Sequence, residues 1–152
     1  MSLGQALERA TGLVFVCSGN MIRSAFAELY ARHLGCDLPL RSAATTYEND
    51  RLHPATRAAL LARGVAREDI DRFRPTHIAR LRESVSPGAV GFGMTRGHLA
   101  VMRGVPELEH SSFLLLSIQG RDEELEDPLH DGRFDESFAT IASCVEDLVA
   151  RL

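Results

Sequence analysis

The sequence predicts an α/β fold: a single-domain three-layer α/β/α sandwich with a central four-stranded parallel sheet. Two observations support this prediction. Short apolar runs alternate with segments of helical periodicity, and 152 residues is the length of one domain. Strands that alternate with helices favour a parallel sheet covered on both faces. Residues 1–152 are therefore interpreted as one domain, in which residues 1–11 are a short helix or a disordered end.

The first half of the chain predicts two strands and two helices. The run GLVFVC (12–17) is apolar, β-branched and bounded by glycine, as expected for a buried strand. A helix follows over 24–34 and is stopped by the next glycine, because four apolar residues share one face: Phe26, Leu29, Tyr30 and Leu34. Residues 38–45 form the second strand, and a helix over 55–63 lies between a proline and a glycine.

The second half predicts two more strands and two more helices. AVGFGM (89–94) is a third strand diluted by glycine, and Thr95 is a suitable N-cap for a helix over 96–103. FLLL (113–116) is the fourth strand. The final helix, 134–152, is the most amphipathic, because six apolar residues recur at steps of four and three: Phe134, Phe138, Ile141, Val145, Leu148 and Leu152.

The composition narrows the class of protein. With a net charge of −4 and no basic surplus, we expect no nucleic-acid partner. No apolar run reaches the roughly 20 residues that span a bilayer, and the first twelve residues lack the regions of a signal peptide. Cys17, Cys36 and Cys144 have neither disulfide-framework nor zinc spacing. We therefore expect reduced thiols, a cytoplasmic location, no membrane and no metal.

The stretch CSGNMIRS (17–24) after the first strand has two interpretations. Taken singly, its residues are ordinary: a buried cysteine, a turn glycine and an N-cap serine. Taken together they suit phosphate chemistry, because a tight loop before a helix directs its backbone N–H groups into one concavity. Gly19 and Asn20 permit the backbone conformations of such a loop. Those donors would favour the thiolate of Cys17, and Arg23 offers a planar cation to phosphate oxygens.

A thiolate that attacks a phosphomonoester needs a general acid for the leaving oxygen. The segment 121–132 contains six carboxylic residues that could serve: Asp122, Glu123, Glu124, Glu126, Asp127 and Asp131. A solvated acidic surface loop is the alternative interpretation. Asp127 differs from the others only in preceding a proline, which holds it extended, so this chemistry alone does not select it.

Four stretches occur in the order and spacing of a known family. They are CSGNMIRS (17–24), RSAAT (41–45), MTRGHL (94–99) and EDPLHDG (126–132). They resemble the phosphate loop, the second strand, the segment after the third strand and the Asp-Pro acid loop of the low-molecular-weight protein tyrosine phosphatases. The arsenate reductases that share this fold are similar. The resemblance runs from about residue 13 to the end of the chain and implies the family's fold, with the phosphate loop between the first strand and the first helix.

The resemblance implies a role for each matching residue. Cys17 would attack phosphorus and form a cysteinyl-phosphate, and Asp127 would protonate the leaving oxygen and then activate water. Ser24 would hydrogen-bond the thiolate, while Asn20 and Ser42 would hold the loop in shape. The phosphate would be bound by the loop as a whole: Ser18, Gly19, Asn20, Met21, Ile22, Arg23 and Ser24. No metal or other cofactor is implied.

Three positions in the loop, at the helix start and in the loop support depart from the family pattern. Ile22 stands where many members have a second cysteine, so we expect no protective disulfide in the loop. Ala25 replaces the usual proline at the helix start. Phe73 stands where many relatives have a histidine that supports the loop asparagine, so we expect a thinner support network there.

The resemblance also implies a substrate wall. Met21 stands where tyrosine phosphatases have a bulky apolar residue and phosphoarginine phosphatases tend to have threonine, which favours an aromatic leaving group. Leu129 and His130 replace paired tyrosines, and Tyr47 offers an aromatic wall. An exposed loop position is the alternative interpretation of His130.

Three functions are compatible with these residues. The first is hydrolysis of a phosphotyrosine protein or a small phosphomonoester, inhibited by inorganic phosphate and other oxyanions. The second is arsenate reduction with a small external thiol; the thioredoxin-coupled version needs two neighbouring cysteines, and Cys36 and Cys144 are far apart in the chain. The third is a non-catalytic phosphate-binding module, which would be expected to lose Cys17, Arg23 or Asp127. No apolar stripe stands out beyond the core faces, which favours a monomer.

Overall fold

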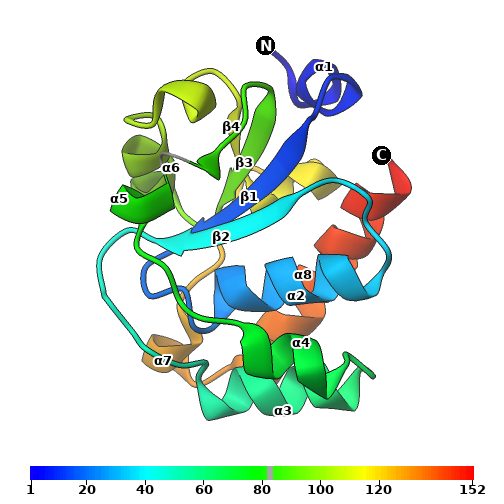
Figure 1. Cartoon of the computed structure of the whole chain (residues 1–152), viewed down its shortest axis with the longest axis vertical. Helices are drawn as coiled ribbons and strands as arrows, with labels where there is room; N and C mark the ends of the chain where they lie inside the picture. The colour runs from blue at the N-terminus through cyan, green and yellow to red at the C-terminus, as the bar shows by residue number, and fades with distance from the viewer. Residues whose placement is uncertain (82–83) are drawn as a thin grey trace.

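The structure, a computed structural model, describes residues 1–81 and 84–152 and has three layers (Figure 1). The middle layer is a sheet of four parallel strands in the order β2-β1-β3-β4. The strands are β1 Gly12–Cys17, β2 Leu40–Ala44, β3 Ala89–Gly93 and β4 Ser112–Leu114. The predicted α/β sandwich with a central four-stranded parallel sheet is confirmed.

Helices and short helical turns make up the outer layers. In chain order they are α1 Leu3–Glu8, α2 Arg23–His33, α3 Pro54–Ala62, α4 Arg67–Arg72, α5 Ile78–Leu81, α6 Arg96–Met102, η2 Pro106–Leu108, η3 Leu115–Gln119, α7 Pro128–Asp131 and α8 Phe134–Ala150. In Figure 1, α2 and α8 cover one face of the sheet and α5 and α6 lie on the other. Within the described residues, no helix combines the length and the apolar character needed to cross a membrane.

The central strand β1 joins two cores because its successive side chains point to opposite faces. Leu13 and Phe15 pack with α2 and α8, while Val14 and Val16 pack with α5 and α6. All six residues of β1 are buried, which agrees with its uniformly apolar sequence. Cys17, the last residue of the strand, is therefore held at the sheet's carboxyl edge by the packing of the whole strand.

The fourth strand and several short helices differ from the sequence prediction. The fourth strand ends at Leu114 rather than at residue 116, because Leu115 and Leu116 are buried through η3 instead of through the sheet. Of the two alternatives for residues 1–11, the structure has the short helix: α1, whose start is capped by Ser2. Helix α4 was not predicted, since Ile70 is its single buried residue and gives no apolar period.

Candidate active site

The loop from Cys17 to Arg23 joins β1 to α2 at the carboxyl end of the sheet. The strand order places β2 on one side of β1 and β3 on the other, so the chain reverses direction across the sheet at this point. Open α/β sheets bind ligands at such a switch point. Within the loop, Asn20 adopts a left-handed conformation with φ 53°, which asparagine tolerates better than most residues.

The thiol of Cys17 lies against the hydroxyl of Ser24. Their Sγ and Oγ atoms are 2.9 Å apart, and Cys17 is only 2% exposed. The Ser24 oxygen also accepts a hydrogen bond of 2.9 Å from Asn20 Nδ2. Its own proton is therefore available to the sulfur, as a hydrogen-bond donor to a thiolate requires.

Asn20 is bound on every side, as a loop-support residue should be. Its Nδ2 donates to Ser42 Oγ as well as to Ser24, and its Oδ1 accepts the backbone N–H of Thr76, each at 2.9 Å. Both polar atoms of the Asn20 side chain thus have partners, and none of these partners is Phe73. A backbone donor from the segment after α4 occupies the carbonyl oxygen instead.

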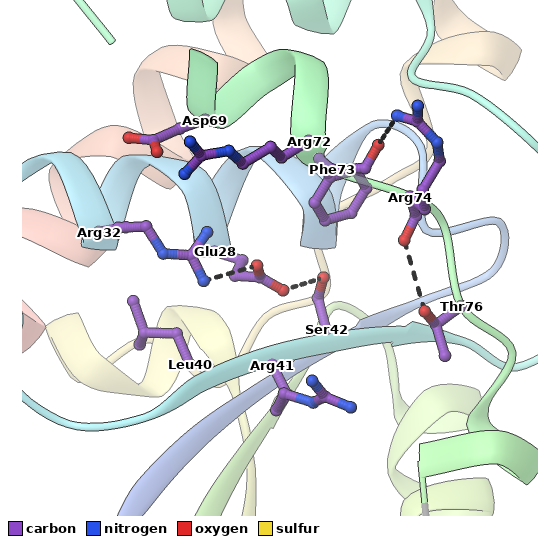
Figure 2. Close-up of a pocket in the computed structure, with 10 residues that line it drawn as sticks. All are labelled: Glu28, Arg32, Leu40, Arg41, Ser42, Asp69, Arg72, Phe73, Arg74 and Thr76. Carbon is purple, nitrogen blue, oxygen red and sulfur yellow. Dashed lines mark hydrogen bonds and ion pairs between the residues drawn. The ribbon is translucent and has the colours of Figure 1, made fainter. Parts of the chain in front are cut away.

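Glu28 continues this network from α2. Ser42 Oγ donates to Glu28 Oε1 at 2.7 Å, and Arg32 Nη2 donates to Oε2 at 3.1 Å (Figure 2). Burial raises the pKa of the Glu28 carboxyl, while its bonds to Ser42 and Arg32 act in the opposite direction. The loop from Cys17 to Arg23 is therefore tied, through the side chains of Asn20 and Ser42, to a buried acid.

Arg23 and Asp127 meet above the loop. Arg23 is 3% exposed; its Nη1 donates to the Leu125 carbonyl at 2.8 Å, and its Nη2 lies 3.6 Å from Asp127 Oδ2. Asp127 Oδ1 accepts the backbone N–H of Leu129 at 3.0 Å and so caps α7. The structure thus brings Cys17, Arg23 and Asp127 to one place, although Asp127 is 104 residues away from Arg23.

His98 supports the loop from the side opposite to Asn20. The backbone N–H of Thr95 donates to His98 Nδ1 at 3.1 Å, so the proton of the neutral ring is on Nε2. Nε2 therefore donates to Ser18 Oγ, 2.9 Å away. Burial, and then the nearby Arg23 guanidinium, lower the pKa of His98 to about 4, which keeps the ring neutral at pH 7.

His98 was missed as a site residue by the sequence reasoning. The available signal was its position three residues after Thr95, the confirmed N-cap of α6, in a box where each residue caps the other. That signal fixes the start of a helix but does not reveal the partner of the other ring nitrogen.

Gly19 serves a purpose different from the predicted one. Its φ is not positive; instead a Cβ there would lie 2.8 Å from Asn49 Nδ2, which donates to the Gly19 carbonyl at 2.9 Å. The glycine is required for this close approach.

The loop encloses a cavity of ≈ 30 Å³, the size of a small oxyanion site rather than a deep pocket. Nine residues line it: Cys17, Ser18, Gly19, Met21, Ile22, Arg23, Tyr47, Asp127 and Leu129. Tyr47 and Leu129 are 61% and 49% exposed and form an apolar rim. His130 is exposed and is not one of the lining residues. Among the described residues, no cluster of three or more histidine, cysteine or acidic side chains could hold a metal.

Comparison with protein-family models and with curated proteins gave no match. Solved structures do match. The low molecular weight protein tyrosine phosphatase SP-PTP from Streptococcus pyogenes is 19% identical, with a TM-score of 0.74 over 93% of each chain. The tyrosine phosphatase Wzb from Escherichia coli K30, in complex with sulphate, is 18% identical, with a TM-score of 0.76 over 93% of this chain and 97% of its own.

The arginine phosphatase YwlE of Bacillus subtilis, with a phosphorylated active-site serine, is 20% identical, with a TM-score of 0.77 over 93% of this chain and 95% of its own. The chain has the fold of the low-molecular-weight protein tyrosine phosphatases. This phosphatase fold does not select a substrate, since tyrosine and arginine phosphatases are similar to the chain to the same degree.

Proposed function

We propose that the protein is a cysteine-dependent phosphomonoester hydrolase that acts on protein phosphotyrosine. The observation that supports this most directly is the meeting of Cys17, Arg23 and Asp127 around one small cavity. A nucleophile, an anion-binding cation and a carboxyl group are the three parts that phosphoryl transfer through cysteine needs.

In the first step, the Cys17 thiolate attacks phosphorus. The S–P bond forms as the P–O bond to the leaving group breaks, and the Asp127 carboxyl transfers its proton to the leaving oxygen. Loop N–H groups and the Arg23 guanidinium bind the equatorial oxygens, where charge is spread in the transition state. Ser24 stabilises the thiolate before attack.

In the second step, a water molecule attacks the cysteinyl-phosphate. The Asp127 carboxylate accepts its proton, a new P–O bond forms and the S–P bond breaks. Inorganic phosphate leaves, and the Cys17 thiolate and the Asp127 carboxyl are regenerated. Atoms and protons balance over the cycle without a metal or an external thiol.

An aromatic substrate is favoured by the rim of the cavity. Met21, Tyr47 and Leu129 offer apolar surface beside the oxyanion position, and two of them are largely exposed. A phenyl ring gains from such contacts through burial and stacking. We infer that the ring of phosphotyrosine lies between Tyr47 and Leu129.

Arsenate reduction through a cysteine relay is less well supported. Cys36 follows the far end of α2, whose 11 residues span about 16 Å, whereas Cys17 precedes its start. Cys144 is buried on α8, and burial raises its pKa to about 11. Neither is placed to accept a disulfide from Cys17. Reduction with a small external thiol would need Cys17 alone but makes no use of Asp127.

Phosphate release from para-nitrophenyl phosphate at mildly acidic pH tests the proposal. The wild-type protein should hydrolyse this ester. The Cys17→Ser variant should not hydrolyse it but should still bind vanadate. Asp127→Asn should slow an alkyl phosphate by about 10²-fold or more but slow the nitrophenyl ester much less. An inactive wild type would refute hydrolysis, and equal slowing of both esters would reject Asp127 as the acid.

A further inference from the structure

A second cavity, of ≈ 380 Å³, lies behind the catalytic loop at the edge of the sheet (Figure 2). It is bounded by α2, β2, α4 and the segment after α4. Ser42 and Thr76, which both bind Asn20, are among its lining residues. Its volume falls in the range of roughly 300–1,000 Å³ that is typical of small-molecule sites, whereas the catalytic cavity measures ≈ 30 Å³.

The lining of this second cavity is rich in arginine. Four of its ten residues are arginine, against 17 of 152 in the whole chain: Arg32, Arg41, Arg72 and Arg74. The acidic lining residues are Glu28 and Asp69. Arg41 extends to the other side of β2 (Figure 2), so three lining cations stand against two acids, in a chain whose net charge is −4. The lining of the cavity is therefore more positive than the chain as a whole, which favours anions there.

Three of these four arginines form no ion pair within the part of the chain that the structure describes. There, Arg41 donates to a serine hydroxyl, Arg74 donates to backbone carbonyls, and Arg72 has no hydrogen-bond or ion-pair partner. Arg32 pairs with Glu28 through Nη2 at 3.1 Å, and its other guanidinium nitrogens donate to no described residue. Guanidinium groups without carboxylate partners are suited to bind phosphate, because each can donate two parallel hydrogen bonds to the phosphate oxygens.

The cavity also has a defined shape. Figure 2 shows the Arg72 side chain extending from α4 above that of Arg32, which extends from α2. The ring of Phe73 forms an apolar wall and points toward Ser42. At the floor, both oxygens of Glu28 already accept hydrogen bonds, so this acid is compensated by its own partners.

We propose that this cavity binds a small organic phosphate, with the phosphate group between Arg32 and Arg72 and the organic part against Phe73. Arg41 takes no part in this contact, because its side chain extends from β2 away from Ser42 and Glu28 and donates to Ser84 (Figure 2). The site is separate from the proposed hydrolysis, because Cys17, Arg23 and Asp127 do not line it.

Adenosine 5′-monophosphate is a suitable probe, and its binding is measured by calorimetric titration. The Cys17→Ser protein is used because this substitution prevents hydrolysis of the probe. We expect saturable binding that weakens about tenfold or more in Cys17→Ser/Arg72→Gln, since a charge-assisted hydrogen-bonded pair is lost. Arg72 is exposed and has no partner among the described residues, so this change should leave the fold intact. Arg103→Gln, which removes an exposed arginine at the end of α6, is the matched control and should bind as before.

Three results with the nucleotide probe would overturn the proposal, and a fourth comes from a peptide probe. The first is no binding at millimolar probe, and the second is equal weakening by Arg72→Gln and Arg103→Gln. The third is binding that Arg23→Gln abolishes and Arg72→Gln leaves unchanged, which would assign the probe to the catalytic loop. A phosphoserine peptide serves as a second probe: Arg72-dependent binding of the peptide, without binding of the nucleotide, would reject a small molecule in favour of a protein partner.

Discussion

The two sides of the loop from Cys17 to Arg23 are held by different chemistry. On the side of β2, Asn20 is bound to Ser42, and Ser42 to the carboxylate of Glu28. On the side of α6, Ser18 accepts a hydrogen bond from the neutral imidazole of His98. The first support ends on an acid and the second on a base, and both end groups are buried.

Burial shifts the pKa values of Glu28 and His98 in opposite directions. It raises the pKa of Glu28 and lowers the pKa of His98 to about 4, because in each case it favours the neutral form. Ionisation of Glu28 on raising the pH therefore costs stability, whereas protonation of His98 on lowering the pH costs stability. The two supports should respond to pH with opposite sign.

The largest expected effect comes from Asn20→Ala. The fully buried side chain makes three hydrogen bonds, and its loss leaves buried partners unsatisfied, at a cost of about 2–4 kcal/mol in the free energy of unfolding. Turnover should fall by about 10²-fold or more, because the loop that presents the nucleophile loses its shape. Chemical denaturation and phosphate release measure the two losses.

Asn49→Ala is the matched control for that change. Asn49 is also an asparagine that supports the loop, but it makes one hydrogen bond, to the Gly19 carbonyl. We expect a loss of about 1 kcal/mol or less. Equal losses in the two variants would show that Asn20 has no special place in the network.

These supports also show what the sequence could and could not predict. Cys17 follows from an apolar strand, and Asn20 and Ser42 from a resemblance that covers their segments. Glu28 is different: its position on a helix gives no local sign that it is buried, because its partner Ser42 lies 14 residues away. Periodicity reports local structure, whereas burial of a polar residue is decided by packing between segments.

His98 is the clearer case. It lies 80 residues from Ser18, and only the fold brings the two together. Asp127 could not be selected from six carboxylic residues by its chemistry, because the property that distinguishes it is proximity to Arg23. The second arginine-lined cavity was likewise invisible in the sequence, since its residues come from α2, β2 and α4.

The next largest effect concerns His98 and stability at low pH. The pKa of a free histidine is 6.5 and that of His98 is about 4, so the unfolded chain binds the proton first and stability falls as the pH drops through this interval. The loss reaches at most about 3 kcal/mol. In His98→Asn this part of the loss should vanish. Urea denaturation at pH values between 6.5 and about 4 measures this loss of stability. If the free energy of unfolding fell equally with pH in both proteins, the loss could not be assigned to His98.

Glu28 should give a smaller slope of the opposite sign. Its pKa in the folded protein lies above the ordinary 4.5, so the folded state retains the proton longer and stability falls as the pH rises from 4.5. The bonds to Ser42 and Arg32 offset part of the burial, which keeps the slope small. The Glu28→Gln variant does not lose this stability, so its free energy of unfolding should increase relative to that of the wild type as the pH rises. If the free energy of unfolding of the variant decreased relative to the wild type instead, the effect of Arg32 on the pKa of Glu28 would outweigh that of burial.

The smallest expected effect is on oxyanion binding, and it depends on the hydrogen bond between His98 of α6 and Ser18. Because His98 Nε2 donates to Ser18 Oγ, the hydroxyl proton of Ser18 remains available to an oxyanion in the cavity that Ser18 lines. Ser18→Ala and His98→Ala should each weaken vanadate binding by about threefold to tenfold, and the double variant should lose little more than either alone. This corresponds to a coupling of about 1 kcal/mol. Additive losses would show that His98 supports α6 alone and does not orient the loop hydroxyl, and Ser18→Thr, which keeps the hydroxyl, should restore most of the affinity.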